Sequence, residues 1–268
     1  MGWEPEPSVI AGCALFAVWY FWVPRGSGRG RSWARALAFV AADTILLLAL
    51  ISPLDTLGER ALFSAHMLQH LLLLEVVAPL LIVAIPPAMA LGWLRRRRLA
   101  QIETGLRRPA LAWTIGFATL ALWHLPWCYD LALRNDALHA IEHLSFLVSA
   151  CIFWWPVLAP LAASRLDTVS SIFYLFARMT ANLMLGIAII AAPTGLYTAY
   201  AHRALPLPFG LTPTLDQQIG GFLMWVPTLL IDAAAAPLLL ALFLKPAARH
   251  VPTSPAATDP AAPAELRS

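Results

Sequence analysis

The stretch 66-HMLQHLLLLEVVAPLLIVAIPP-87 decides which kind of protein this chain forms. His66 and His70 are four residues apart, which places their imidazoles on one face of a helix, one turn from each other. The residues that follow are apolar over a length that crosses a bilayer as a helix. An imidazole pair at the mouth of a membrane helix predicts a polar site there, provided that other parts of the chain bring groups to the same place.

The composition places the chain among helical membrane proteins. It has 268 residues, of which 60% are apolar and only 12% are charged, about half the charged fraction of a soluble domain. Continuous apolar runs of roughly 20 residues recur, without the alternation that is typical of barrel strands. We therefore predict an all-α polytopic membrane bundle that forms one domain over 1–245, followed by a disordered, Ala- and Pro-rich cytoplasmic tail over 246–268.

The apolar runs predict seven membrane-spanning helices. These lie at about 8–23, 34–52, 63–86, 110–127, 138–159, 168–192 and 216–244. Fourteen of the 18 Lys and Arg residues then fall on one side, and only Arg60, Arg134 and Arg203 fall on the other. Because cytoplasmic loops carry the excess of positive charge, we expect the N-terminus outside and the C-terminus in the cytoplasm. Glu4 and Glu6 precede the first run, where a cleavable signal peptide would carry positive charge.

This topology gathers the histidines on one side of the membrane. Of the seven histidines, only His250 is then cytoplasmic. The other six are His66 and His70 at the start of the third span, His124 near the outer end of the fourth, His139 and His143 at the start of the fifth, and His202 in the last outer loop. A single histidine often lies at an interface simply because its ring has a polar tip. Two i, i+4 pairs with His124 at a matching depth favour a shared site instead.

Imidazoles that converge from separate helices are donors for copper, zinc, iron or nickel. We predict a transition-metal site formed by His66, His70, His124, His139 and His143. The weaker candidates are Met67, Cys128, His202 and Met224. Thioether and thiolate ligands favour Cu(I), although Met67 and Cys128 also fit ordinary buried positions. The carboxylates that are placed to orient these rings are Glu142, Asp130, Asp136 and Asp216. Asp136 and Glu142 fit a helix start equally well.

A second polar group lies deep within the spans. Its members are Asp43, Glu75, Arg178 and Asp232, with Asn182 one turn from Arg178. An isolated charge in the bilayer core costs at least ~2.5–3.5 kcal/mol, so we expect Arg178 to pair with one or more of the three carboxylates. A structural network that fixes helix packing is the favoured interpretation, and a proton or ion relay is the alternative.

Four sequence blocks resemble the cytochrome c oxidase assembly factor CtaG family, in its seven-helix integral membrane branch. They are 52-SPLDTLGERALFSAHMLQHLLLL-74, 122-LWHLPWCYD-130, 139-HAIEHLSFLVSACIFWWPVL-158 and 216-DQQIGGFLMWVP-227. The matching residues are His66, Met67, Gln69, His70, Trp123, His124, Tyr129, His139, His143, Asp216, Gln217 and Gln218. The resemblance covers the second to seventh spans. It implies a bacterial plasma-membrane protein that helps to assemble a haem–copper oxidase, with the supply of copper as its expected contribution.

The leading hypothesis is therefore an assembly factor that binds or delivers copper through the outer histidines. Its expected partners are oxidase subunits, the lipid bilayer and a copper chaperone. Two alternatives stay open: a b-type cytochrome with bis-histidine haem ligation, and a metal or proton transporter that uses the deep acidic layer. No nucleophile–base pairing or phosphate-binding Gly-rich loop is evident, so we do not expect an enzyme. The basic run 25-RGSGRGR-31 favours lipid headgroups over nucleic acid.

Overall fold

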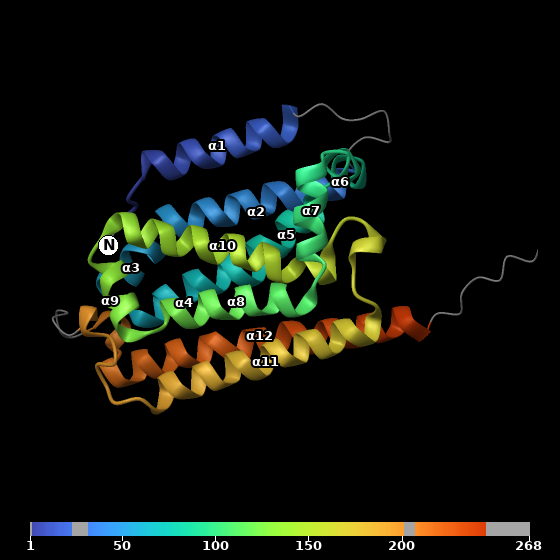
Figure 1. Ribbon diagram of the computed structural model, residues 1–268. Coiled ribbons are helices and arrows are strands. Elements are labelled where there is room, and N and C mark those ends of the chain that lie inside the picture. Colours follow the sequence, from blue (N-terminus) through green and yellow to red (C-terminus); the bar gives the residue numbers. More distant parts are fainter. Residues whose placement is uncertain (1, 23–31, 201–206, 245–268) are drawn as a thin grey trace, which may run out of the picture.

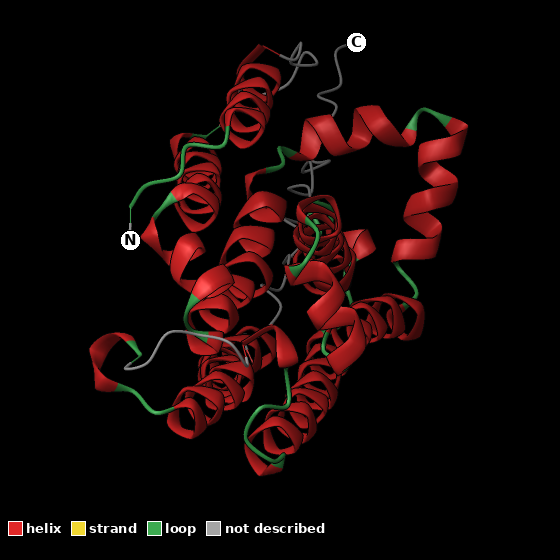
Figure 2. Ribbon diagram, turned by 90° about the vertical axis from the view of Figure 1, so that its left-hand side faces the viewer, coloured by secondary structure: helices red, strands yellow, loops and turns green. Residues whose placement is uncertain are grey.

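The computed structural model describes residues 2–22, 32–200 and 207–244, and the regular secondary structure of this part of the chain is helical, without strands. The helices are α1 (Pro7–Trp22), α2 (Trp33–Ile51), α3 (Pro53–Arg60), α4 (Phe63–Leu71), the π-helical turn η1 (Leu72–Val77), α5 (Ala78–Ala84), α6 (Pro87–Leu94), α7 (Arg97–Leu106), α8 (Pro109–Trp123), α9 (Pro126–Leu133), α10 (Asp136–Leu158), η2 (Ala162–Ser164), α11 (Thr168–Ala191), η3 (Thr198–Tyr200), η4 (Pro208–Gly210) and α12 (Pro213–Leu244). The long helices run side by side (Figure 1), and a view turned by 90° shows most of them end-on (Figure 2). The all-α prediction is confirmed for the described residues.

Several helices have the length and apolar character of membrane spans. Four of them qualify fully among the described residues: α2, the continuous run from Phe63 to Ala84, α10 and α11. Helices α1 and α8 are apolar but shorter. The chain is therefore a multi-pass membrane protein, while the number of seven spans and their orientation stay predictions. The basic run 25–31, His202 and the tail 246–268 lie outside the described residues.

Caps and prolines set helix boundaries that the apolar runs alone did not predict. The Ser52 N–H bonds the Leu48 carbonyl and ends α2, while the Ser52 hydroxyl accepts the Leu54 N–H and starts α3. The expected fourth span, 110–127, is interrupted because α8 ends at Trp123 and the short helix α9 starts at Pro126. The additional short helices α3 and α9 both flank the ends of helices that carry histidines.

The third expected span is not a uniform α-helix. It passes from α4 through η1 into α5. Pro79 has no backbone N–H, which removes the α-helical hydrogen bond to the Glu75 carbonyl. The neighbouring carbonyl, that of Leu74, accepts a hydrogen bond from the Trp154 indole at 3.0 Å. Single π-helical turns inside α-helices are frequent at functional sites, and this one carries the buried Glu75.

Two glycines let α11 and α12 pack at close range. A Cβ atom at Gly186 would lie 2.7 Å from the Gly221 carbonyl oxygen, and a Cβ atom at Gly221 would lie 2.8 Å from the Gly186 carbonyl oxygen. Small residues at such crossings allow helix backbones in membranes to approach closely. The crossing holds Arg178 of α11 next to Asp232 of α12.

Helix α1 lies at the edge of the bundle next to α2 (Figure 1). Its Tyr20 ring stacks on Phe39 of α2, with ring centroids 3.8 Å apart, and the Tyr20 hydroxyl donates to the Ala84 carbonyl at 2.9 Å. These contacts fix the C-terminal half of α1. Its N-terminal half borders a cavity whose other walls come from α2, α3 and α10.

Candidate metal centre

The helix that carries His66 and His70 starts at an acceptor supplied by another helix. Leu62, the residue before α4, provides no side-chain cap. The fully buried carboxylate of Asp216 on α12 accepts the backbone N–H groups of Phe63 and Ser64, each at 2.9 Å, and the Ser64 hydroxyl at 2.6 Å. Free N–H groups at a helix start need acceptors and favour negative charge. Asp216 therefore fixes where α4 begins and where its histidines lie.

The structure brings the five main sequence candidates together. The ring centroids of His66 and His139 are 5.1 Å apart, and those of His70 and His143 are 5.5 Å apart. The His124 ring lies 5.9 Å from that of His70. All five side chains are at most 8% exposed. The two i, i+4 pairs thus face each other across α4 and α10 in two successive layers.

Hydrogen bonds determine which nitrogen of His66 carries the proton. The Tyr200 hydroxyl donates to the Gly58 carbonyl at 2.5 Å, since a carbonyl oxygen only accepts. In the arrangement that gives each of these short contacts a proton, the Tyr129 hydroxyl, 2.9 Å from that of Tyr200, donates to it. The Tyr129 oxygen is left to accept from Nδ1–H of His66 at 2.7 Å. In neutral His66 the Nε2 atom therefore carries a lone pair.

The same argument applies to His139. Its Nδ1 lies 2.9 Å from Oε1 of Glu59, and the hydrogen bond with His139 lowers the pKa of Glu59 and keeps the carboxylate ionised. The proton of neutral His139 is thus on Nδ1, and its Nε2 lone pair faces Nε2 of His66 at 3.3 Å. Two lone pairs at that distance repel, so the contact requires a cation between them, either a proton or a metal ion.

More donor atoms in the cluster have no hydrogen-bond partner. Among the described residues these buried atoms are both ring nitrogens of His70, Nε2 of His143 and both carboxylate oxygens of Glu142. Nε2 of His70 lies 3.7 Å from Oε1 of Glu142, which is too long for a hydrogen bond. An unsatisfied buried polar group costs about 1–3 kcal/mol. Such a concentration of unpaired donors and acceptors indicates a place for a bound cation.

Two sets of atoms are close enough to share one ion. Ligand atoms of His66, His70 and His143 lie within 4.8 Å of one another, as do those of His66, His139 and Glu142. With metal–nitrogen bonds of about 2.0–2.1 Å, two tetrahedral ligands lie about 3.3 Å apart, which matches the separation of 3.3 Å between His66 and His139. Imidazoles with one carboxylate fit a transition metal.

His124 and Met67 extend the cluster. Nδ1 of His124 donates to the Leu120 carbonyl at 2.8 Å, so that its Nε2 lone pair lies 3.4 Å from Sδ of Met67. The thioether and this imidazole form a soft donor pair beside His70.

The remaining weak candidates lie elsewhere. Met224 packs in the apolar cluster around Phe63 and Met67. Cys128 is buried on α9, outside both sets of atoms that share an ion in the described part of the chain. Asp130 fixes the loop at Thr198 by accepting its N–H and hydroxyl, rather than orienting a histidine.

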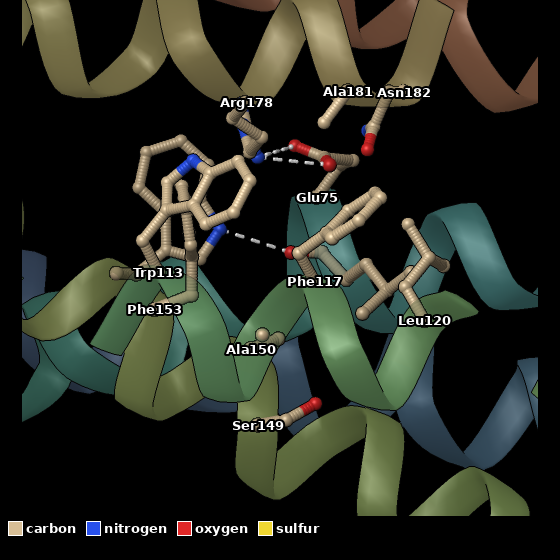
Figure 3. Close-up of a pocket in the computed structure, with 13 residues that line it drawn as sticks. Glu75, Trp113, Phe117, Leu120, Ser149, Ala150, Phe153, Arg178, Ala181 and Asn182 are labelled. Carbon is tan, nitrogen blue, oxygen red and sulfur yellow. Dashed lines mark hydrogen bonds and ion pairs between the residues drawn. The ribbon is translucent and has the colours of Figure 1, made fainter. Parts of the chain in front are cut away.

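Deeper in the bundle, Arg178 forms ion pairs with Glu75 at 2.7 Å and with Asp232 at 2.5 Å. Figure 3 shows Arg178 and Asn182 reaching towards Glu75 beside a small cavity. This cavity of about 40 Å³ has room for a few water molecules. Two carboxylates and one guanidinium leave one net negative charge inside the membrane unless a proton or cation is bound.

Asp43 does not belong to this network, contrary to the expectation from its depth. It faces α1, where the Cys13 thiol donates a hydrogen bond to it. The helix length fixes how deep a residue lies, but the rotation of α2 about its axis turns Asp43 away from Arg178.

A family model of the cytochrome c oxidase caa3 assembly factor (Caa3_CtaG) matches residues 14–245. The chain belongs to this assembly factor family. The resemblance predicted from the four sequence blocks is confirmed. The Caa3_CtaG family is named for an assembly role and not for an enzymatic one.

The curated relatives of this Caa3_CtaG member are described only as uncharacterized proteins. The chain is 26% identical over 215 residues to one from Mycobacterium bovis and to one from Mycobacterium tuberculosis, and 25% identical over 217 residues to one from Mycobacterium leprae. The match covers 74% of this chain and 32–33% of each relative. The chain thus spans about a third of the length of these relatives. No solved structure matches.

Several of the residues that match the Caa3_CtaG family fix helix ends and offer no ligand atom to the histidine cluster. Besides Asp216, the Gln217 amide donates to the Ile189 and Ala192 carbonyls and closes the end of α11. Gln218 is exposed. Glu59 was not predicted from the sequence, because it follows no spacing rule with His139. Its only signal is its place inside the block 52–74.

Proposed function

We propose that this protein binds a copper ion in the buried histidine cluster and supplies it during assembly of a haem–copper oxidase. The observation that carries the proposal is the approach of Nε2 of His66 and Nε2 of His139 at 3.3 Å, a contact that needs a cation between two lone pairs. With both Nδ1–H groups bonded elsewhere, the two Nε2 lone pairs are directed at the place where a metal ion binds.

The surrounding donors favour a metal ion over a shared proton. A proton satisfies only two nitrogens, whereas His70, His143 and Glu142 offer further buried atoms without partners. Imidazole accepts copper, zinc, iron or nickel, and the thioether of Met67 beside His124 favours Cu(I) among these. Copper is also the ion that a haem–copper oxidase must acquire. The proposed partners are an oxidase subunit and a copper chaperone, and the proposed position of the cluster is near the outer membrane face.

The packing gives less support to haem ligation. The ring centroids of neighbouring histidines are 4.2–5.9 Å apart, and the Phe146 ring lies 4.6 Å from that of His70. A porphyrin between two axial histidines requires these rings to separate widely. A visible spectrum of the purified protein distinguishes the two functions, because a haem protein shows a Soret band.

The test of the assembly role uses a strain that lacks the native protein. We expect the variant His66→Ala/His70→Ala to leave the oxidase with its haem but without its full copper content, with activity restored by added copper. The variant Tyr174→Phe, which loses only a hydroxyl that donates to the Phe153 carbonyl, serves as the control. Full copper content and activity of the oxidase with the double variant would refute the proposed role.

A further inference from the structure

A cavity of about 420 Å³ lies beside the histidine cluster, lined by residues of the N-terminal half of α1 and of helices α2, α3 and α10. His139 and His143 are part of its lining. His143 is only 8% exposed, and its buried Nε2 has no hydrogen-bond partner. The cavity thus leads to a donor atom that is free to bind a ligand.

The lining of this cavity is strongly acidic. Its charged residues are Glu4, Glu6, Asp55, Glu59, Asp136 and Arg60. Arg60 is paired with Glu4 at 3.0 Å, and it is the one Lys or Arg side chain against five carboxylates in the described lining. Glu59 connects the acidic lining to the histidine cluster, because its Oε1 lies 2.9 Å from Nδ1 of His139. A cleft lined by one sign of charge concentrates ions of the opposite sign and accelerates their association.

A second cavity, of about 200 Å³, borders the cluster on the side of Tyr197 and Tyr200. Its described lining contains neither a carboxylate nor an imidazole. It therefore lacks the charge that attracts a cation and the donor atoms that pass it on. The contrast identifies the acidic cavity as the better path.

We infer that the acidic cavity is the route by which a copper cation reaches the histidine cluster. This inference rests on the proposed metal site. The cation is held near the mouth by Glu6 and Asp136 and then passes Glu59 to reach the Nε2 atoms of His139 and His143. The route predicts an effect on the rate of binding that is separate from the number of ions bound.

Gly12 provides a way to narrow the cavity. It lies in the lining, and a Cβ atom placed on it meets no other atom within 4 Å. The variant Gly12→Phe therefore projects a ring into the cavity without a clash at Cβ. Gly92 on α6 is equally open and lies outside the lining, so Gly92→Phe is the matched control.

The experiment mixes Cu(I), held as its weak acetonitrile complex without oxygen, with the full chain in nanodiscs and follows tryptophan fluorescence by stopped flow. We expect Gly12→Phe and Glu6→Gln/Asp136→Asn to lower the association rate by about fivefold or more, as expected for lost access and lost steering. Copper per chain at equilibrium stays unchanged, and the charge variant also loses salt dependence of the rate. Gly92→Phe behaves like the wild type.

Unchanged association rates in both test variants, with full copper content, overturn the route and leave the metal site intact. A loss of bound copper in parallel with the rate also overturns it, because these residues then belong to the site itself. If the wild-type protein binds no copper at equilibrium, the proposed function fails, and this outcome is read directly from the metal content.

Discussion

Nε2 of His66 and Nε2 of His139 face each other at 3.3 Å, and both carry lone pairs because their Nδ1–H groups are already bonded. The two residues come from different helices, and each is held by an acceptor on yet another element. Tyr129 on α9 holds His66, and Glu59 on α3 holds His139. The positions of the two imidazoles are therefore set by the fold before any ion binds.

Removing the acceptor of His66 should weaken metal binding without touching a ligand. In Tyr129→Phe, Nδ1–H of His66 loses its nearer acceptor and keeps only the Tyr200 oxygen at 3.5 Å, and the tautomer with the proton on Nε2 gains by bonding His139. We expect copper affinity to fall about 10- to 100-fold, which is typical when a group that orients a metal ligand is lost. A competition titration with a copper chelator measures this change.

Tyr174→Phe is the control for that titration, since Tyr174 is also buried and also donates one hydroxyl hydrogen bond, but to Phe153. Equal affinities of the Tyr129 and Tyr174 variants would contradict the proton assignment on His66.

Glu142 should destabilise the metal-free protein. Its side chain is fully buried and neither oxygen has a hydrogen-bond partner. We expect Glu142→Leu to raise the free energy of unfolding without metal by about 1–3 kcal/mol, and to reduce the stabilisation that copper adds. Thermal unfolding in detergent, with and without copper, measures both effects.

The matched variant is Gln69→Leu on α4. Gln69 is also fully buried, but its amide donates to the Ala49 carbonyl at 2.8 Å and to Asp55 at 2.5 Å. We expect this variant to lower stability in both conditions. A destabilised Glu142→Leu protein without metal would show that Glu142 has a purely structural role.

The cap that Asp216 provides should contribute more to the free energy of unfolding than an exposed helix cap does. Asp216→Ala leaves the N–H groups of Phe63 and Ser64 and the Ser64 hydroxyl buried without this acceptor. We expect a loss of about 2–4 kcal/mol in unfolding free energy. Asp167→Ala, which removes an exposed cap of α11, should cost only about 1 kcal/mol. Denaturant titration of both variants compares them, and equal losses would argue against the buried cap.

The ion pairs of Arg178 should be structural. Arg178→Leu leaves Glu75 and Asp232 buried as unpaired carboxylates, which costs about 3–5 kcal/mol, so little folded protein should be recovered. Replacing all three together, as Glu75→Gln/Arg178→Leu/Asp232→Asn, should restore folding. Size-exclusion chromatography after expression measures recovery. A well-folded but inactive Arg178→Leu protein would instead support a relay.

The exposed pair of Arg60 and Glu4 is the control for this experiment. Arg60→Leu should change unfolding free energy by at most about 1 kcal/mol, since exposed ion pairs contribute little.

The histidine cluster could be predicted from the sequence because it depends mainly on how far along its helix each histidine lies. The i, i+4 spacing aligns His66 with His70 and His139 with His143 along their helices, and equal distances from the starts of α4 and α10 place the pairs at one level. The rotation of each helix about its axis is not encoded in such patterns. That rotation separates Asp43, which faces Cys13, from Glu75 and Asp232, which face Arg178.

The positioning groups could not be predicted in the same way. Asp216 reaches the start of α4 across about 150 residues of sequence, and Glu59 reaches His139 from a short helix that no apolar pattern marks. The π-helical turn at Glu75 likewise left no periodic signal in a run of leucines and valines. These features depend on tertiary contacts between elements.

The copper content of the purified protein tests the central claim most directly. After reconstitution with copper and removal of the excess, elemental analysis should find bound copper in the wild type. The double variants His66→Ala/His70→Ala and His139→Ala/His143→Ala should each lose it while remaining folded. An unchanged ratio of copper to protein in both double variants would contradict the assignment of the histidine cluster as the metal site.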